Sequence, residues 1–376
     1  MKHEQAKRKM NKMNILFILG TPIISAISVA YMIFENTMRL ETLMLAFILA
    51  VFTGLSITVG YHRLLSHRTF EATWPVRLFL LIFGAASFQN SVKYWCSYHR
   101  DHHVFVDQES DPYNIKKGFF HAHMGWIFYK HPENKSFDNI LDLLQDPLVR
   151  FQDRYYYSIA IFFGLLLPMG IAALWGDVWG GFFIAGITRI VFNHHCTFFI
   201  NSIAHFVGRQ PYSDKNTSRD SWLMAFFTYG EGYHNFHHAF QADYRNGYRV
   251  YHWDPGKWSI TLLKWIGLVK NLRFIPKEKI VITKIRMQEQ KLLEKIESGK
   301  INTTKVTENL VTNTRQKIEE AYVLFQELKA EYKKLKKLKV DSVKEQIATL
   351  KEEIRKTKRM LKKAHNSWAS LCLAVS

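Results

Sequence analysis

Long apolar runs alternate along the chain with polar stretches that are rich in histidine. Four of these runs are long enough to cross a bilayer as helices, which takes about 20 mostly apolar residues. The loops inside each successive pair are short, so the pattern predicts two transmembrane hairpins. The four expected spans are residues 14–34, 43–60, 158–175 and 179–200.

A fifth apolar stretch, residues 76–88, is shorter than a span and contains Arg77. Its length fits a helix that lies at the membrane interface or re-enters the bilayer. With four spans and a basic N-terminal segment, the positive-inside rule places both termini in the cytoplasm. Residues 61–157 and 201–376 then lie on that side too. We therefore expect an all-α integral membrane protein with a cytoplasmic helical cap.

The last quarter of the chain follows a different pattern. From residue 279 onward, Lys, Glu, Leu and Ile recur at helical spacing without proline. We expect helices over residues 315–339 and 342–367 that form a hairpin, alone or as a coiled coil with a partner or a second copy. The sequence thus predicts a membrane domain over residues 1–278 and a basic helical extension over residues 279–376.

The charge distribution and the cysteines exclude some classes of function. The formal net charge is +19, and the residues from Lys279 onward hold 23 Lys and Arg against 12 Asp and Glu. The remaining positive charge flanks the apolar runs, which is typical of membrane proteins rather than of a nucleic-acid groove. The three cysteines show no paired spacing, so we expect reduced core thiols and neither disulfides nor a thiolate metal site.

The 17 histidines are concentrated in three motifs. In a helix, positions i, i+3 and i+4 share one face, so each HxxHH motif offers three imidazoles in one direction. The HxxxxH motif separates its histidines by about 140° on a regular helix, so we expect that helix to end or unwind there. The motifs are His62 with His67, then His99, His102 and His103, and finally His234, His237 and His238.

This set of imidazoles indicates metal binding. Imidazole nitrogen suits iron, copper, zinc and nickel, and no thiolate set favours zinc. Eight or more imidazoles imply two ions, because one ion takes at most about six ligands. Two iron ions with oxygen fit a site beside lipid best, since such cofactors can break an unactivated methylene C–H bond. Structural zinc and a metal-transport path are the alternatives, although transport would place ionisable residues inside the spans.

Taken together, the motifs resemble the membrane fatty acid desaturase family, specifically its acyl-CoA (stearoyl-CoA) delta-9 branch. The resemblance covers roughly residues 45–270 and is carried by several segments. These are HRLLSH at 62–67, HRDHH at 99–103, DPYN at 111–114, KGF at 117–119, NSIAH at 201–205 and GEGYHNFHH at 230–238.

The resemblance implies two further ligand positions, Asn201 and His205, and a division of all ligands between two irons. Asp111, Glu231 and Asn235 are implied to fix the tautomers of the ligand imidazoles. One iron would be held by His62, His67, His99, His103 and His237, and the other by His102, His205, His234 and His238, with Asn201 acting through water.

The resemblance also implies a bent tunnel that leads an acyl chain past the metals. Gln89, Trp95 and Thr197 correspond to residues at the bend, and Phe198 stands where animal enzymes have Trp. Contacts to CoA are implied for Asn90, Lys116, Lys117 and Lys130, unless these lysines form only a positive collar at the membrane. Ser97-Tyr98 replaces an Arg-Asp pair, which leaves acyl carrier protein or a lipid headgroup as alternative carriers.

Two small residues and several other histidines complete the candidates. Ala50 and Gly54 share one helical face, and we hypothesise that they leave the tunnel deep enough for long acyl chains; close helix packing is the alternative. His194 and His195 lie inside the fourth expected span and match no family ligand. Surface or interface roles are expected for His121, His123, His131 and His252.

The expected function is the oxygen-dependent introduction of a cis double bond, at delta-9, into a saturated acyl chain. No HPGG-type haem segment occurs in the sequence, so we expect a separate electron donor, such as a ferredoxin or cytochrome b5, drawn to the basic face. Hydroxylation of the same chain and a non-catalytic metal-binding scaffold are the alternatives. No targeting signal is visible, and a bacterial plasma membrane is favoured over the endoplasmic reticulum.

Overall fold

The structure is a computed structural model that describes residues 9–131, 135–298, 307–338 and 344–373. Its contacts divide the chain into two compact units. The first holds residues 1–210 and 214–274, and the second holds residues 211–213 and 275–376. The first unit contains the apolar helices and the histidine motifs. The functional division expected at residue 278 stays a prediction.

Three helical stretches of the first unit are long and apolar enough to cross a membrane: Lys12–Phe34, Leu40–Ser66 and Tyr156–Ala173. They correspond to the first three expected spans. Two of them contain π-helical turns. Their elements are α1 (Lys12–Phe34), α2 (Leu40–Leu55) with η1 (Ser56–Ser66), and α8 (Tyr156–Ile161) with η5 (Phe162–Leu166) and α9 (Leu167–Ala173).

The fourth expected span is helical throughout but is not among these three. It consists of α10 (Val178–Gly180), the π-helix η6 (Gly181–Thr188) and α11 (Arg189–Asn201). Its apolar run is interrupted by Arg189, Asn193 and two histidines, which lower its mean hydropathy. The structure therefore confirms a mostly helical membrane protein, while the number of spans stays a prediction.

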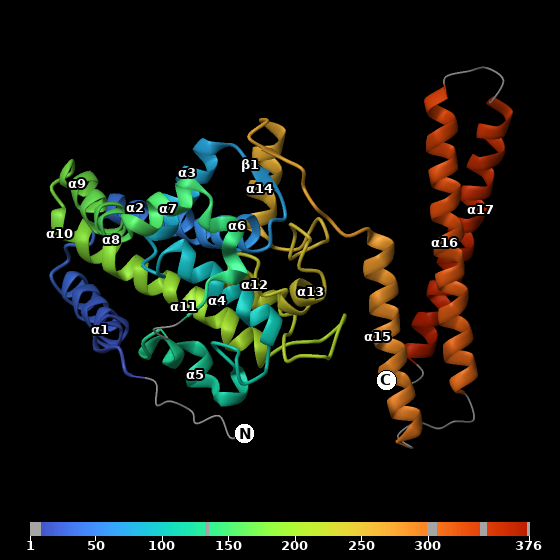
Figure 1. The fold of residues 1–376 in the computed structure, drawn as a ribbon, viewed down its shortest axis with the longest axis horizontal. Helices are drawn as coiled ribbons and strands as arrows, with labels where there is room; N and C mark the ends of the chain where they lie inside the picture. The colour runs from blue at the N-terminus through green and yellow to red at the C-terminus, as the bar shows by residue number, and fades with distance from the viewer. Residues whose placement is uncertain (1–8, 132–134, 299–306, 339–343, 374–376) are drawn as a thin grey trace. The chain divides into compact units, whose positions relative to one another are not determined.

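The other elements of the first unit are short and connect or cover these helices (Figure 1). The stretch predicted at 76–88 forms α3, which at 12 residues is shorter than a span. The elements are β1 (Glu71–Ala72), α3 (Trp74–Ala85), α4 (Val92–Phe105), η2 (Ile115–Lys117), α5 (Phe119–His123), η3 (Gly125–Phe128), η4 (Asp138–Ile140), α6 (Leu141–Leu144), α7 (Pro147–Arg154), η7 (Ile203–His205), α12 (Trp222–Phe227), α13 (His234–Ala239), α14 (Pro255–Trp265) and β2 (Val269–Lys270), which pairs antiparallel with β1.

The π-helix η1 places the first histidine motif. The amide of His67 donates to the carbonyl oxygen of His62 at 3.0 Å, a bond over five residues. Such a bond is characteristic of the π-helix, which is wider than the α-helix and is found often at functional sites. The His62 and His67 rings consequently lie only 4.8 Å apart between centroids. The helix therefore widens, and ends at His67, where the sequence predicts that it ends or unwinds.

A buried arginine connects the π-helical segments. The Arg189 guanidinium donates to the carbonyl oxygens of Ala86 and Gly164 at 2.8 Å each, and to that of Ala185 at 3.2 Å. Gly164 and Ala185 lie in η5 and η6, where π-helical turns alter the regular backbone bonding. A charged side chain inside an apolar helix is costly unless backbone carbonyls or counter-ions receive it. Arg189 thus joins α3, η5 and η6 through polar contacts.

The second unit is a bundle of three helices: α15 (Lys277–Glu297), α16 (Glu308–Leu338) and α17 (Lys344–Leu373). Figure 1 shows α16 and α17 side by side. These two helices occupy the region where the sequence predicts helices over 315–339 and 342–367, and residues 339–343 lie outside the described residues. Their shared core with α15 consists of Ile285, Leu292, Ile296, Val311, Ile318 and Trp368.

The space beside Gly54 is filled by the ring of Tyr229. A side chain on Gly54 would overlap this ring. The Tyr229 hydroxyl lies 3.0 Å from the Ala50 carbonyl oxygen and 2.9 Å from Asn193 Oδ1. Gly54 is therefore a site of close packing in this structure. The hypothesis that Ala50 and Gly54 deepen an acyl tunnel stays a prediction without support from this packing.

Replacing Gly54 by Leu is expected to destabilise the protein by about 1–3 kcal/mol, because the Tyr229 ring must move and its hydroxyl loses its partners. Gly20 in α1 offers the matched control, since a Cβ there would meet no atom within 4 Å. Thermal unfolding of the detergent-solubilised chain should give a lower Tm for Gly54→Leu than for Gly20→Leu. Equal Tm values would contradict the packing described here.

Candidate metal centre

Nine histidines gather in two groups within the part of the chain that the structure describes. The ligand nitrogens of each group all lie within 4.8 Å of one another. The grouping is the one that the family resemblance implies. The first group is His62, His67, His99, His103 and His237, and the second is His102, His205, His234 and His238.

Each HxxHH motif contributes to both groups. On α4, His99 and His103 belong to the first group and His102 to the second. On α13, His237 belongs to the first group, while His234 and His238 belong to the second. The sequence predicts three imidazoles in one direction from each motif, and this expectation is wrong. Side chains at i, i+3 and i+4 fan out over part of a face, which suffices to serve two centres.

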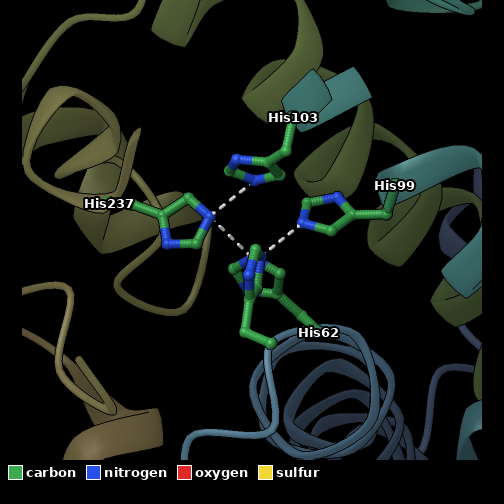
Figure 2. A group of neighbouring side chains, drawn as sticks. His62, His99, His103 and His237 are labelled. Atoms are coloured by element: carbon green, nitrogen blue, oxygen red, sulfur yellow. Dashed lines mark hydrogen bonds between the residues drawn. The ribbon is translucent and has the colours of Figure 1, made fainter. Parts of the chain in front are cut away.

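The imidazole nitrogens of the first group converge on a common point. Figure 2 shows the rings of His62, His99, His103 and His237 turned toward one another. The Nε2 atom of His237 lies 3.0 Å from that of His62 and 2.9 Å from that of His103. The Nε2 atoms of His67 and His99 are 2.8 Å apart.

The second group has the same geometry. The Nε2 atom of His234 lies 3.0 Å from that of His205 and 3.1 Å from that of His238. The Nε2 atoms of His102 and His238 are 3.3 Å apart. Nitrogen ligands at about 2.1 Å from one metal ion lie about 3.0–3.4 Å apart at octahedral or tetrahedral angles. Both groups therefore have the spacing of ligands around an ion.

The outer nitrogens of three imidazoles determine their tautomers. His62 Nδ1 lies 3.0 Å from Glu231 Oε2, and His102 Nδ1 lies 2.9 Å from Asp111 Oδ1. A carboxylate can only accept, so each of these Nδ1 atoms carries the hydrogen. His205 Nδ1 lies 2.8 Å from the Thr217 hydroxyl, which itself donates to Asp107 at 2.7 Å. His205 must therefore donate to Thr217.

Because their Nδ1 atoms are protonated, neutral His62, His102 and His205 each present an Nε2 lone pair to the centre of a group. Lone pairs that face one another at about 3 Å repel unless a proton or a cation lies between them. The donor set consists of imidazole nitrogen without thiolate, which fits iron, copper, zinc or nickel. The residues present thus fit two bound transition-metal ions.

Burial keeps most of these imidazoles neutral. It lowers the pKa of His67, His99, His103, His205, His237 and His238 well below the usual value, and neighbouring imidazoles add to the effect. Burial likewise lowers the pKa of His234 to about 3. Metal binding requires unprotonated imidazole, so these groups are ready to bind at neutral pH.

Glu231 connects the first group to a buried network of charges. Its carboxylate accepts from His62, from Arg63 at 3.0 Å and from Thr58. Arg63 also pairs with Asp254 at 2.9 Å, and both residues are almost completely buried. Burial alone would raise the pKa of Glu231, but His62 and Arg63 hold it well below its usual value. The carboxylate is therefore charged and orients the His62 ring.

Sequence reasoning missed several residues that support the centre. Arg63 lies inside the first motif, yet no spacing between residues in the sequence indicates its buried pairing with Glu231 and Asp254. Thr217 and Asp107, which hold His205, are 110 residues apart in the chain. Pairs so distant in sequence become visible only when the fold brings them together.

Asn201 and Asn235 differ from the other implied residues. α11 ends at Asn201, and His205 is carried by the separate turn η7, so the two do not share a regular helix. The Asn235 amide donates to the Ser218 carbonyl oxygen at 3.1 Å. Their roles as a water-mediated ligand and as a support for an imidazole stay predictions.

Of the residues implied for the acyl chain, Trp95 lies beside the first group. Trp95 stacks on the His99 ring with centroids 5.0 Å apart. The Gln89 amide donates to the Thr197 hydroxyl at 2.9 Å, which brings two of the implied bend residues into contact. Phe198 is buried and lies near the His194 and His123 rings.

The residues implied for the carrier have varied surroundings. Lys116 and Lys130 are exposed, and Lys117 pairs with Glu109 at 3.0 Å. Asn90 lies with its amide nitrogen 3.1 Å from His131 Nε2. The Tyr98 hydroxyl, which stands in place of the family's Arg-Asp pair, approaches His131 Nδ1 at 2.5 Å.

The other expected histidines belong to neither metal group. His194 bonds to the carbonyl oxygen of Ser87 at 2.9 Å. His195 and His123 bond to each other at 3.0 Å, and His123 also bonds to the Ser202 hydroxyl. His252 stacks on Tyr233. His121 is half-buried and lies outside both groups.

The sequence model of the fatty acid desaturase family matches residues 41–255. This match covers more than half of the chain and includes all nine histidines of the two groups. The chain therefore belongs to the fatty acid desaturase family, and the resemblance drawn from the motifs is confirmed.

Several relatives support this membership. The chain is 42% identical over 290 residues to a "Probable acyl-CoA desaturase" of Schizosaccharomyces pombe, covering 77% of this chain and 60% of that protein. It is 38% identical over 299 residues to "Acyl-CoA desaturase 1" of Saccharomyces cerevisiae, covering 78% and 57%. A Delta(9)-fatty-acid desaturase of Caenorhabditis elegans is 38% identical, with coverage of 64% and 74%.

The chain thus spans about three fifths of the length of the two yeast relatives. All three relatives are eukaryotic. The bacterial plasma membrane that the sequence favours draws no support from them and stays a prediction, whereas an integral membrane location agrees with both the family and the apolar helices.

Replacing His237 by Ala should reduce the metal content of the purified chain. His237 Nε2 lies against two other imidazoles of the first group, so its loss opens that group. We expect about one metal ion per chain in place of two, with the metal content measured by elemental mass spectrometry. His365→Ala in the second unit is the matched control, and full metal content in both variants would refute the assignment.

Replacing Glu231 by Gln should weaken metal binding about 10- to 100-fold, because the charged acceptor that orients His62 is lost. Competition with a chelator would measure the change in Kd. Glu71→Gln serves as the control, since Glu71 is exposed and its contacts are to Asn271 at 3.0 Å and Lys270 at 3.6 Å, away from the metal groups. An unchanged Kd in Glu231→Gln would show that this carboxylate does not support the centre.

Proposed function

We propose that the chain is an acyl-CoA desaturase that introduces a cis double bond into a saturated fatty acyl chain, at delta-9, with two bound iron ions and oxygen. The observation that carries the proposal is the pair of imidazole groups, with ligand spacing and fixed tautomers, in a chain of the fatty acid desaturase family. The two yeast relatives are named acyl-CoA desaturases, and one further relative is named for delta-9.

The residues of this chain hold, orient and enclose the reaction site. Bound iron with oxygen supplies the oxidising power to break unactivated methylene C–H bonds. Glu231 and Asp111 fix the imidazoles of His62 and His102, and Thr217 fixes that of His205. The burial of both groups keeps bulk water away, which protects reactive species from side reactions.

The substrate path is proposed from Trp95, which contacts the first group, and from the contact between Gln89 and Thr197. Trp95 covers His99, and the bond between Gln89 and Thr197 joins the segment after α3 to α11. A rigid wall at this point would hold the acyl chain in one bent conformation and so select the bond that reacts. The family resemblance implies that Phe198 belongs to the same wall.

The carrier and the electron donor follow from charge. Lys116 and Lys130 are exposed and available to the phosphates of CoA. Lys117 and Asn90 are added to this set by the family resemblance. Electrons would come from a separate acidic donor such as a ferredoxin or cytochrome b5. The stretch 178–201 is proposed as a fourth span, which places both termini in the cytoplasm beside the histidines. Residues 279–376 would form a separate extension of the membrane domain.

Expression in a host with a simple saturated fatty acid profile tests the proposal. Total lipids are analysed by gas chromatography with mass spectrometry, beside His237→Ala as the inactive control. We expect a new monounsaturated acid that is absent from the control, with its double bond at carbon 9. A double bond at another position would overturn the delta-9 assignment.

Other products would change the assignment. A new hydroxy acid would identify the chain as a hydroxylase of the same family. Purified protein that lacks bound iron would refute the proposal at its base. If iron is bound but no product forms, acyl-CoA and a reduced electron donor are added to the purified chain. Inactivity with every donor tested would overturn the proposal that the chain is a desaturase.

A further inference from the structure

The hairpin of α16 and α17 continues beyond the part that α15 covers. α15 is tied to α16 by Arg286 to Glu319 at 2.6 Å and by Glu289 to Arg315 at 3.0 Å. The start of α15 lies beside Gln326, with which it lines a shallow cavity. Figure 1 shows α16 and α17 running on together past this point. We call residues 329–337 and 344–359 the distal hairpin.

The distal hairpin carries a large excess of positive charge. It contains four acidic residues and eleven basic ones, and all fifteen are exposed. The remaining described helices of the second unit, residues 277–297, 308–328 and 360–373, contain ten basic and eight acidic residues. The basic residues of the distal hairpin are Lys329, Lys333, Lys334, Lys336, Lys337, Lys344, Lys351, Arg355, Lys356, Lys358 and Arg359.

The charges of the two parts have different surroundings. In the covered part, Glu319 binds both Arg286 and Arg315, and Glu289 binds Arg315 again, so cations and carboxylates form one network. In the distal hairpin, Arg355 meets Glu352 at 3.5 Å, and both are exposed. An exposed pair of this kind contributes little to stability. Lys329 lies over the Phe325 ring, but four carboxylates are too few to balance the eleven cations of the distal hairpin as the covered part is balanced.

The basic residues are arranged along the helices in rows. Lys344, Lys351 and Lys358 repeat every seven residues and thus lie on one side of α17, with Arg355 four residues from Lys351. The buried Leu350 lies on a different side of α17 from these lysines. Like charges spaced at i, i+4 repel each other and destabilise a helix. An anionic surface opposite these rows would relieve that repulsion.

We propose that the distal hairpin binds a membrane surface that contains anionic lipid. The second unit is continuous in sequence with a unit of membrane-spanning helices, so a lipid surface is always present at high effective concentration. Each Lys or Arg near an anionic leaflet contributes about 1 kcal/mol to binding. Two helices side by side offer many such cations at once, whereas a protein partner would have to provide a matching acidic face.

The full chain in neutral phosphatidylcholine nanodiscs provides the test. It is mixed with vesicles of phosphatidylcholine alone or with about 30 mol% phosphatidylglycerol, and bound protein is measured by sedimentation. We expect binding to the anionic vesicles only, with loss of binding at high salt. Replacing Lys329, Lys336, Lys351 and Lys358 together by Gln should weaken it at least about a hundredfold.

The matched control removes four charges from the covered part: Lys279, Lys284, Lys291 and Lys295 are replaced by Gln, and binding should change little. Circular dichroism checks that both variants keep their helices. Equal loss in both variants would overturn the proposal, because net charge alone would then explain binding. Tighter binding to double-stranded DNA than to anionic vesicles would also overturn it, in favour of a nucleic-acid partner.

Discussion

The convergence of nine imidazoles into two tight groups is the constraint on which the candidate metal centre of this molecule depends. His62, His102 and His205 have their hydrogens fixed on Nδ1, so their Nε2 atoms can only accept. Other imidazole nitrogens lie about 3 Å from them. Either a hydrogen donated by the facing imidazole or a bound cation must lie between such atoms, and a cation that binds there stabilises the folded unit, so folding and metal binding are coupled.

The buried carboxylates are the second element of that coupling. A charged Glu231 in an apolar interior would be very unfavourable alone, and Arg63 and Asp254 extend the compensation to α14 and the segment before it. Breaking one partner of a buried pair leaves an uncompensated charge, which costs several kcal/mol. The position of the His62 ring is thus determined by residues from both ends of the first unit, and not by η1 alone.

The sequence predicted the centre well where spacing alone defines it. Eight of the nine histidines lie in three motifs, and their helical repeats indicated two metals before any fold was known. His205 stands alone in its segment and was accessible only through family resemblance. The split of each HxxHH motif between two groups came from the family resemblance and not from spacing, because spacing gives the face of a helix but not the number of centres opposite it.

Other features depend on packing that no local pattern encodes. The π-helical turn at His67 needs a hydrogen bond over five residues, and the sequence indicated only that a regular helix could not continue. The Tyr229 ring fills the space beside Gly54, although the two residues are 175 positions apart in the chain. The small residue that suggested open space in the sequence is therefore a site of close packing. The interrupted fourth apolar run also shows that Arg189 can be accommodated by backbone carbonyls.

The distribution of ligands along the chain has a consequence for biosynthesis. Four of the five imidazoles of the first group have been translated by residue 103, whereas the second group has only His102 until His205 emerges. Neither group is complete before α13 leaves the ribosome. A nascent chain interrupted before residue 234 therefore has its long apolar helices but neither complete metal site.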